Sequence, residues 1–385
     1  MLSLPLIPST SPTLAEAMRT CLLRAGLSRV PGINSYVLGN PKAWLGTAYH
    51  KVLERLPELA AAGEHAPALL EHFWQEEITR LRQEACGHPL NHRFGEPLYW
   101  RGYHLVLATL RLRAAEMIPS AGAHQSPPAS IGVPETFQEK EFVAFSGKLK
   151  GKPDLGRGEE IIDFKTGSIY ETDELDAPPA LKEAYVRQLR IYAYLVHEAV
   201  GRWPRRGLLY PIAGSPVEVE LDPAACTREA IEAVALLDRY NDALGRSADP
   251  ADLASASPDT CRWCPYKLAC PAFWKSADPS WAGALDGEAA SGRLLGPVRS
   301  VFGGTAYALS IDADGGTIPH GGISLSPLPT AVHAAGGGLS ENDRVRVVGL
   351  GRRENGTLYP TLKTVILSET AVPSIAYLLL NSEGG

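Results

Sequence analysis

Two carboxylates and an amine lie close together in the stretch GKPDLGRGEEIIDFKTG, residues 151–167. Asp154 ends one short predicted strand, and Asp163 and Lys165 alternate on the next, so both side chains point to the same side while Phe164 points away. Hard divalent cations take oxygen ligands, and two aspartates with the backbone carbonyl of Phe164 leave positions open for water and a phosphate. In such a site Lys165 orients or deprotonates the water, or stabilises the charge that builds on the phosphate. The alternative is a solvated hairpin with an incidental Asp-Phe-Lys sequence.

Polar side chains in two predicted helices extend this candidate site. His50 lies in the helical stretch GTAYHKVLE, and Gln188 and Tyr192 lie four residues apart in a helix expected over residues 181–201. That spacing places Gln188 and Tyr192 on one helix face. Taken alone, each of these residues is more often an ordinary surface or core residue than a functional one.

The combined pattern resembles the PD-(D/E)XK nuclease superfamily, and specifically its RecB-like branch. Four motifs carry the resemblance in the family's order: G-x-x-x-H at residues 46–50, G-x-x-D at 151–154, D-x-K at 163–165 and Q-x-x-x-Y at 188–192. An acidic residue on the strand before G-x-x-D is common in the superfamily. Either Glu139 or Glu141 fits that place.

The resemblance implies a fold class and a set of functional residues. The fold is α/β, with a mixed-sheet core of the restriction-endonuclease type inside a helical shell. The implied catalytic residues are Asp154, Asp163, Lys165, Gln188 and Tyr192. The implied ligands for Mg²⁺ or Mn²⁺ are His50, Asp154, Asp163 and the backbone carbonyl of Phe164.

Three of the six cysteines, Cys261, Cys264 and Cys270, fall in the stretch CRWCPYKLAC, which indicates a metal site more than a disulfide framework. Cys21 is the candidate fourth ligand. One upstream and three downstream cysteines resemble the RecB-like nucleases with an iron-sulfur cluster, which include CRISPR-adaptation exonucleases and AddB-type nuclease domains. Leu22, however, stands where those proteins often have proline. The resemblance implies a 4Fe-4S cluster that clasps the two ends of the nuclease domain. Zinc is the rival, because C-x2-C is also half of a zinc knuckle.

The rest of the sequence predicts the elements that must position these side chains. Apolar residues at three- and four-residue spacing predict helices over residues 14–27, 46–62, 66–86, 99–118, 181–201 and 227–245. Short apolar runs predict strands over residues 137–145, 151–156 and 160–167, and two more within 205–222. A loop rich in Pro, Ala and Ser is expected over residues 120–134. A RecB-like nuclease domain is therefore expected over residues 1–280.

A second domain is expected over residues 286–375, where glycine becomes frequent and the sequence has no cysteine. Period-two runs broken by Gly, Asp and Asn predict a small five-stranded barrel similar to an OB-fold. OB-folds bind single strands through cations and aromatic rings. The candidate DNA-binding residues are Arg344, Arg346, Arg352, Arg353, Tyr359 and Lys363. A barrel that docks protein is the alternative.

The composition limits the class of protein. The chain has 385 residues, of which 45% are hydrophobic and 21% charged, and this excludes disorder as the main state. The sequence has no apolar run of about 18 residues and no basic, apolar leader, so we expect a cytoplasmic protein that neither spans a membrane nor is secreted. A net charge of −6 argues against coating nucleic acid by bulk charge but permits a local basic groove.

The sequence as a whole predicts a metal-dependent DNA nuclease that hydrolyses phosphodiester bonds, an exonuclease acting on single strands or DNA ends. Its expected setting is DNA repair, or antiphage or CRISPR-type defence. The alternative is a catalytically idle DNA-binding scaffold that works with a helicase or another defence component. An idle subunit is expected to have lost Asp163 or Lys165, and both are present.

Overall fold

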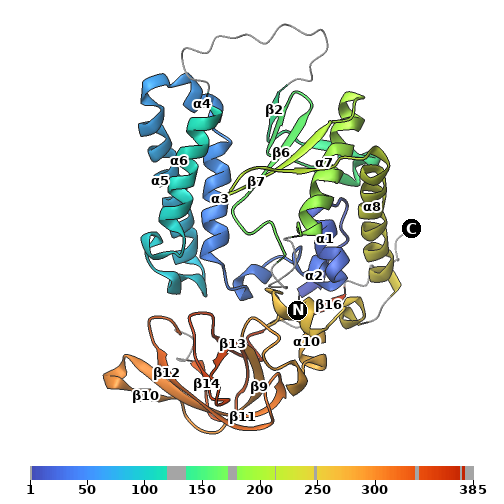
Figure 1. Ribbon diagram of the computed structural model, residues 1–385. Coiled ribbons are helices and arrows are strands. Elements are labelled where there is room, and N and C mark those ends of the chain that lie inside the picture. The colour runs from blue at the N-terminus through green and yellow to red at the C-terminus, as the bar shows by residue number, and fades with distance from the viewer. Residues whose placement is uncertain are drawn as a thin grey trace, which may run out of the picture.

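The computed structural model describes residues 2–118, 136–171, 180–212, 214–246, 249–333, 338–372 and 375–377. A mixed sheet stands between two groups of helices, and a curled sheet from late in the chain lies below them in Figure 1. The loop predicted over residues 120–134 lies outside the described residues. Within the described ranges, no helix is long and apolar enough to cross a membrane.

The central sheet has five strands in the order β2-β5-β6-β7-β8. Their bounds are Phe137–Gln138, Leu155–Arg157, Glu160–Lys165, Arg206–Pro211 and Val217–Val219. β6 runs antiparallel to β5 and parallel to β7, so it lies in the middle of the sheet. Four consecutive residues of β6, from Ile161 to Phe164, are buried, as expected of a strand covered on both faces.

The prediction of one continuous strand over residues 137–145 is wrong. β2 joins the central sheet, whereas β3 (Phe142–Ala144) pairs with β4 (Leu149–Gly151) in a separate hairpin. Glu139 lies between β2 and β3 with a φ of 49°, a left-handed conformation that ends an extended strand. The predicted strand over residues 151–156 is likewise divided between β4 and β5.

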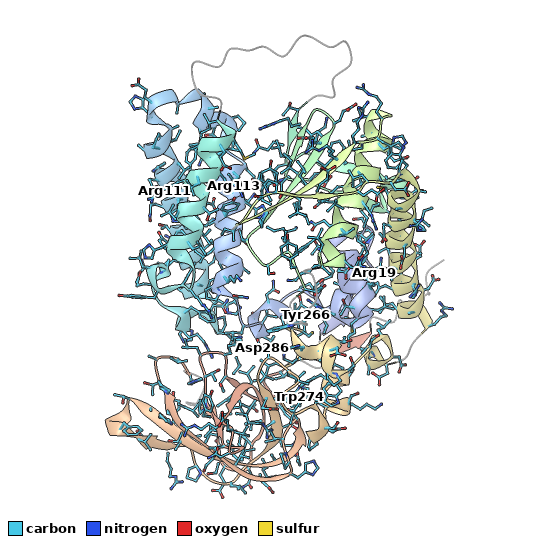
Figure 2. All side chains as sticks on the ribbon, viewed as in Figure 1. Arg19, Arg111, Arg113, Tyr266, Trp274 and Asp286 are labelled. Atoms are coloured by element: carbon cyan, nitrogen blue, oxygen red, sulfur yellow. The ribbon has the colours of Figure 1, made fainter. Side chains whose placement is uncertain are left out.

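Alternate residues of β6 pack against two groups of helices. Ile162 and Phe164 belong to the core formed with α3, α5 and α6, and Ile161 belongs to the core formed with α7 and α8. These five helices span Pro41–Leu53, Ala66–Gly87, Tyr103–Met117, Glu183–Val200 and Pro223–Arg246. The shorter helices α4, α9 and α10 span Leu56–Ala61, Pro258–Arg262 and Pro271–Ser276. Arg113 of α6 donates to the carbonyl oxygen of Pro211, at the end of β7, at 3.3 Å (Figure 2).

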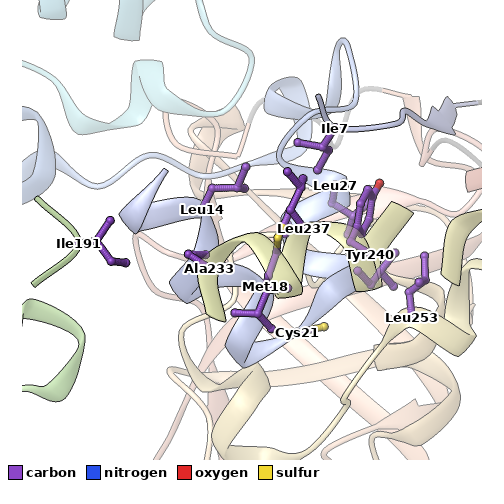
Figure 3. Packing of buried hydrophobic residues seen from close by; sticks show 14 of the residues in the cluster. Ile7, Leu14, Met18, Cys21, Leu27, Ile191, Ala233, Leu237, Tyr240 and Leu253 are labelled. Carbon is purple, nitrogen blue, oxygen red and sulfur yellow. The ribbon is translucent and has the colours of Figure 1, made fainter. Parts of the chain in front are cut away.

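The predicted helix over residues 14–27 is two helices that meet at Cys21. The bounds of α1 and α2 are Pro12–Thr20 and Leu22–Leu27. Cys21 has extended backbone angles, with φ −165° and ψ 118°. Met18 of α1 and Leu237 of α8 share a core beside this junction (Figure 3). The chain therefore turns a corner at the cysteine, a break that periodicity alone does not reveal.

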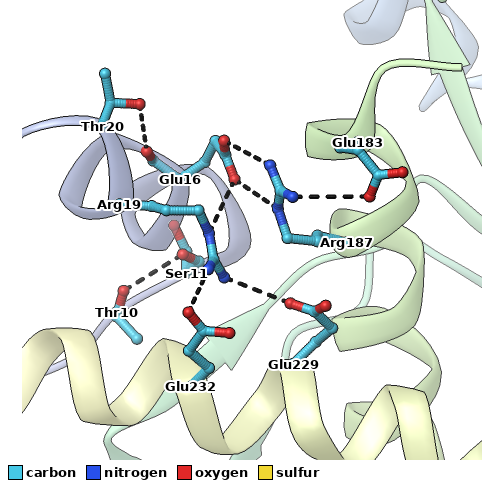
Figure 4. A network of polar contacts seen from close by, with 9 residues as sticks. All are labelled: Thr10, Ser11, Glu16, Arg19, Thr20, Glu183, Arg187, Glu229 and Glu232. Carbon is cyan, nitrogen blue, oxygen red and sulfur yellow. Dashed lines mark hydrogen bonds and ion pairs between the residues drawn. The ribbon is translucent and has the colours of Figure 1, made fainter. Parts of the chain in front are cut away.

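Ion pairs hold α1 against α7 and α8 (Figure 4). Arg187 of α7 donates to both carboxylate oxygens of Glu16, at 3.0 and 2.9 Å. Arg19 of α1 contacts Glu229 and Glu232 of α8. An isolated surface ion pair contributes little to stability, but this network joins three helices through shared charges. It therefore fixes the orientation of the N-terminal helix.

Residues after 286 form a curled antiparallel sheet, a half-barrel that is compatible with an OB-like fold (Figure 1). The bounds of β9 to β15 are Glu288–Leu294, Arg299–Val301, Ala306–Gly316, Gly321–Pro329, Arg344–Arg352, Leu358–Tyr359 and Val365–Ser368. The prediction of five strands is wrong, because it misses β9 and merges β14 with β15. β9 pairs with both β11 and β13, but its sequence EAASGRL has small residues in place of the β-branched ones that identify strands.

The curled sheet packs against the segment that carries the clustered cysteines. Arg346 of β13 donates through Nη1 to the carbonyl oxygen of Leu268 at 2.9 Å, and its guanidinium lies 5.4 Å from the ring centre of Trp274 (Figure 2). Arg93, in the helical part, donates to the carbonyl oxygen of Thr364 at 2.6 Å. A separate parallel pair, β1 with β16, joins Leu2–Leu4 to Ile375–Tyr377. The division into domains at residues 280–286 stays a prediction.

Replacing Arg346 with alanine is expected to lower the free energy of unfolding by about 2 kcal/mol, since charge-assisted hydrogen bonds contribute roughly 1.5–3 kcal/mol. The substitution removes a bond to the cysteine-bearing segment, so amide exchange in residues 261–270 is also expected to accelerate. Denaturant unfolding and hydrogen exchange measure the two effects. Arg353→Ala, which removes an exposed cation from the same sheet, is the control. Equal effects of the two substitutions would contradict the role given to Arg346.

Candidate active site

Asp163 is buried in β6, with 2% of its surface exposed. Burial raises the pKa of its carboxyl to about 6, although the nearby Lys165 acts to lower it. The ammonium of Lys165 lies 2.5 Å from Oδ2 of Asp163. Within the described residues, that oxygen accepts no hydrogen bond of good geometry. Apart from the ammonium of Lys165, this buried oxygen has no partner among the described residues, so it keeps a lone pair with which to bind a metal cation.

Asp154 and His50 approach the same place from different elements. Asp154 follows β4, and its Oδ2 accepts a hydrogen bond from the backbone N–H of Phe164 at 2.7 Å. Nδ1 of His50, on α3, lies 3.5 Å from the same oxygen. Burial acts to lower the pKa of His50, but the carboxylates of Asp154 and Asp163 outweigh it and raise the pKa. The imidazole therefore lies in the field of both aspartates.

Lys165 is held by residues of α7. Its Nζ donates to Oε1 of Gln188 at 2.8 Å, and Nε2 of Gln188 donates to the hydroxyl oxygen of Tyr192 at 3.0 Å. The ring centre of Tyr185 lies 4.6 Å from Nζ of Lys165. Tyr185 is not among the site residues predicted from the sequence, although it lies three residues before Gln188 and so shares its helix face. These contacts fix the position of the ammonium.

Two glycines allow the helices to approach the strands this closely. A Cβ at Gly46 of α3 would lie 2.5 Å from Oγ1 of Thr166, which directly follows β6. A Cβ at Gly151 of β4 would lie 2.5 Å from Leu195 and 3.0 Å from the ring of Tyr192, both on α7. The first glycine lies one helical turn before the histidine of the site. Both motif glycines are therefore points of close packing.

Replacing Gly151 with valine is expected to destabilise the fold by about 1–3 kcal/mol, because the added side chain overpacks the contact with α7. The displaced ring of Tyr192 is also expected to disturb the hydrogen bonds that lead to Lys165. Denaturant unfolding measures the first effect, and the rate of DNA cleavage measures the second. Gly245→Val is the matched control, since nothing lies within 4 Å of a Cβ at that position. Unchanged stability of the Gly151 variant would show that α7 does not pack closely against β4 at this position.

The structure places Glu139, and not Glu141, beside Asp154. The backbone N–H of Glu139 donates to the carbonyl oxygen of Asp154 at 3.1 Å, and its carboxylate lies 2.5 Å from the ammonium of Lys152. Burial raises the pKa of Glu139, and the charge of Asp154 adds to the rise while Lys152 opposes it. Glu141 is exposed. Of the two residues that the sequence left open, Glu139 is therefore the acidic neighbour of the site.

A pocket of about 430 Å³ lies beside these side chains. His50, Lys165 and Gln188 line it from the site, and Glu16 and Arg24 line it from α1 and α2. The volume falls within the range of sites that enclose a small ligand. The catalytic candidates are therefore accessible from a concave surface that the N-terminal helices help to build.

Cys21, at the corner between α1 and α2, shares a buried core with Cys261 and Cys270, which lie after α8. Cys21, Cys261 and Cys270 are buried, Cys264 is half-buried, and all four are free thiols. Burial raises the pKa of Cys261, Cys264 and Cys270, in the last case to about 12, and Cys21 adds to the rise in each. The thiols therefore lie within electrostatic reach of one another, although Cys21 is remote in sequence.

The candidate DNA-binding cations of the curled sheet mostly contact protein. Arg344, Arg352 and Lys363 each pair with carboxylates of the curled sheet or of the segment leading into it. Arg346 is the junction residue described above. Arg353 and Tyr359 are exposed, with the guanidinium 5.6 Å from the ring centre. The DNA-binding role of this set stays a prediction.

The fold and the site define an α/β protein in which carboxylates and a lysine meet at the end of the middle strand of a mixed sheet. The sequence pattern of the PD-(D/E)XK nuclease superfamily matches residues 9–271, and the chain belongs to this superfamily. The match covers the helical shell, the central sheet and the clustered cysteines. No curated protein matches the chain. Membership implies a metal-dependent phosphodiester hydrolase that acts on DNA. Within the part of the chain that the structure describes, no group of three or more His, Cys, Asp or Glu side chains has the arrangement that holds a metal ion.

Proposed function

We propose that this protein is a metal-dependent DNA nuclease, an exonuclease that acts on single strands or DNA ends. The observation that carries the proposal is the buried carboxylate of Asp163, which lies beside Lys165 and in the field of Asp154 next to an accessible pocket. A structural ion pair has no need of a second carboxylate at the same place, because like charges disfavour each other's ionisation. Such an arrangement is typical of functional sites.

The residues that would hold Mg²⁺ or Mn²⁺ are His50, Asp154, Asp163 and the carbonyl oxygen of Phe164. The donors suit a hard cation, because they are mostly oxygens and Oδ2 of Asp163 is buried without a hydrogen-bond donor. Two aspartates, one histidine and one backbone carbonyl would leave coordination positions open for water and a phosphate. A cation bound here supplies Lewis-acid stabilisation of the phosphate and a lower pKa for water.

Lys165 is the cationic group that we propose to face the scissile phosphate. Its side chain lines the pocket, where the ammonium stabilises the charge that builds on the phosphate or orients the attacking water. Gln188 holds this ammonium by a direct hydrogen bond, and Tyr192 holds Gln188. We therefore assign Gln188 and Tyr192 as positioning residues that act through Lys165.

Cys21, Cys261, Cys264 and Cys270 are proposed to bind a 4Fe-4S cluster. The cluster would join the N-terminal helices to the segment after α8. The burial of these cysteines and their mutual electrostatic effects support a metal centre that they bind together. The charges of Arg24 and Lys267 lower the pKa of Cys264 against the effect of burial, and so favour the thiolate that a cluster requires. Zinc is the alternative metal at these cysteines.

The curled sheet is proposed to act as a packing or docking element. This role agrees with the pairing of three of its candidate cations with carboxylates. A helicase or a defence-system protein is the proposed partner, in DNA repair or in antiphage or CRISPR-type defence. DNA binding through the exposed Arg353 and Tyr359 is the competing proposal.

The test is a cleavage assay on end-labelled single-stranded, duplex and circular DNA with Mg²⁺ or Mn²⁺. We expect single strands and duplex ends to be degraded and circular DNA to persist, because an exonuclease needs an end. Cleavage of circles would replace the exonuclease assignment with an endonuclease. Lack of any metal-dependent cleavage would remove the enzymatic assignment and favour the idle DNA-binding scaffold.

A further inference from the structure

A second pocket adjoins the first across the turn that follows β6. It has a volume of about 270 Å³ and lies between this turn and the helices α3 and α6. Thr166 and Gly167 line both pockets. The two pockets, here called the two-pocket track, therefore meet directly beside Lys165.

Each pocket contributes positive charge that no carboxylate neutralises within the described residues. Arg24 of α2 lines the first pocket, and Lys42 and Arg101 line the second. None of these three side chains forms an ion pair with a described residue, whereas Arg19 and Arg187 near the first pocket are both paired. Arg24 is half-buried, and an unpaired guanidinium in such a place is suited to an anionic ligand.

Each pocket also contributes a tyrosine ring. Tyr185 lines the first pocket, and Tyr170 lines the second. Both rings are half-buried, so each is accessible at the pocket surface. Cations that follow a backbone, interleaved with aromatic rings that stack on bases, are the means by which proteins bind single strands without sequence preference.

We infer that the two-pocket track binds one strand of single-stranded DNA across the active site, with Arg24 on one side of the scissile phosphate and Lys42 and Arg101 on the other. The inference rests on the proposed nuclease function, which fixes the scissile phosphate beside Lys165. Volumes of about 430 and 270 Å³ suit the individual nucleotides of one strand better than a double helix. The strand is therefore held on both sides of the point of cleavage.

The test measures how the affinity for a labelled oligonucleotide depends on salt, with Ca²⁺ in place of Mg²⁺. For single strands, each phosphate contact contributes about 0.7 to the slope of log Kd against log salt concentration. Arg24→Gln is expected to lower this slope by about 0.7 and to weaken binding about fourfold, and K42Q/R101Q to lower it by about 1.4. Arg24→Lys is expected to restore the slope. The charge-matched control R205Q/R246Q removes two exposed cations away from the track and is expected to leave the slope unchanged.

Two results would overturn the inference: slopes equal to that of the unmodified protein in both track variants, or duplex binding that is as tight as single-strand binding and equally sensitive to these substitutions. The nuclease function has a separate readout in the same proteins, which is cleavage with Mg²⁺. Reduced slopes without any cleavage in the unmodified protein would support the track and reject the nuclease function. Normal cleavage with unchanged slopes would support the nuclease function and reject the track.

Discussion

Replacing Asp163 with asparagine is expected to reduce DNA cleavage by roughly 10³-fold or more, since one electrostatic group of this kind contributes about 10²–10³ to the rate and the carboxylate is also a proposed metal ligand. The amide has the same shape but no charge, so a bound cation loses its buried anionic ligand. Lys165 keeps its hydrogen bond to Gln188. The measurement is the initial rate on end-labelled single-stranded DNA over a range of Mg²⁺ and Mn²⁺ concentrations.

The same substitution is expected to leave the protein at least as stable as before. Burial disfavours the charged carboxylate of Asp163, as its raised pKa shows, and the neutral amide removes that cost. Asp238→Asn, at a surface ion pair with Lys148, is the control and is expected to retain full activity. Undiminished cleavage by the Asp163 variant would remove the site assignment, and loss of activity together with unfolding would leave Lys165→Ala as the deciding variant.

Replacing Cys21 with serine is expected to abolish a visible absorbance at about 400 nm that a 4Fe-4S cluster produces. It is also expected to lower the melting temperature by roughly 10 °C. In the chain-entropy view, a link that closes a chain loop longer than 100 residues adds about 4 kcal/mol to the free energy of unfolding. Each kcal/mol shifts the melting temperature of a large domain by about 2–4 °C. Anaerobic purification, iron analysis and thermal unfolding supply the measurements.

Cys86→Ser is the matched control, because Cys86 is exposed and lies on α5, away from the gathered thiols. It is expected to leave both colour and melting temperature unchanged. Zinc would replace the cluster as the proposed metal if the unmodified protein is colourless and contains stoichiometric zinc, and the Cys21 variant shows the same loss of stability. An unchanged melting temperature and unchanged metal content would show that Cys21 is no ligand.

The sequence predicts the strand that carries the site better than the surroundings of that strand. β6 is recognisable because an apolar pair, Ile161 and Ile162, leads directly into Asp163 and Lys165, and because side chains alternate by geometry. β9 is not recognisable, because its small residues have little strand preference of their own and it is held by pairing on both edges. The corner at Cys21 escapes prediction for a similar reason: the apolar spacing continues through it, and only tertiary packing breaks the helix.

The roles of the charged residues are also hard to predict where they depend on tertiary contacts. Spacing predicts that Gln188 and Tyr192 share a helix face, because helix periodicity is a local property, whereas their link to the site comes from the family resemblance. Arg346 reads in the sequence as a groove cation, yet it bonds to a carbonyl of the cysteine-bearing segment, which is far away along the chain. Arg24 attracts no notice in the sequence, and its importance emerges only from the pocket that it lines. Partners that are distant in sequence decide these cases.

The pairing of residues 2–4 with residues 375–377 sets the order in which a newly made chain can finish folding. The backbone N–H of Ile7 donates to the side chain of Asn241 at 3.0 Å, and Arg19 of α1 contacts Glu229 and Glu232 of α8. At about 5–20 residues per second, the ribosome reaches these partners on the order of ten seconds or more after the N-terminus emerges. The N-terminal helices, one of which supplies Arg24 to the pocket, therefore dock late. Translation products that stop before α8 are thus expected to lack a finished active-site wall and to cleave DNA poorly.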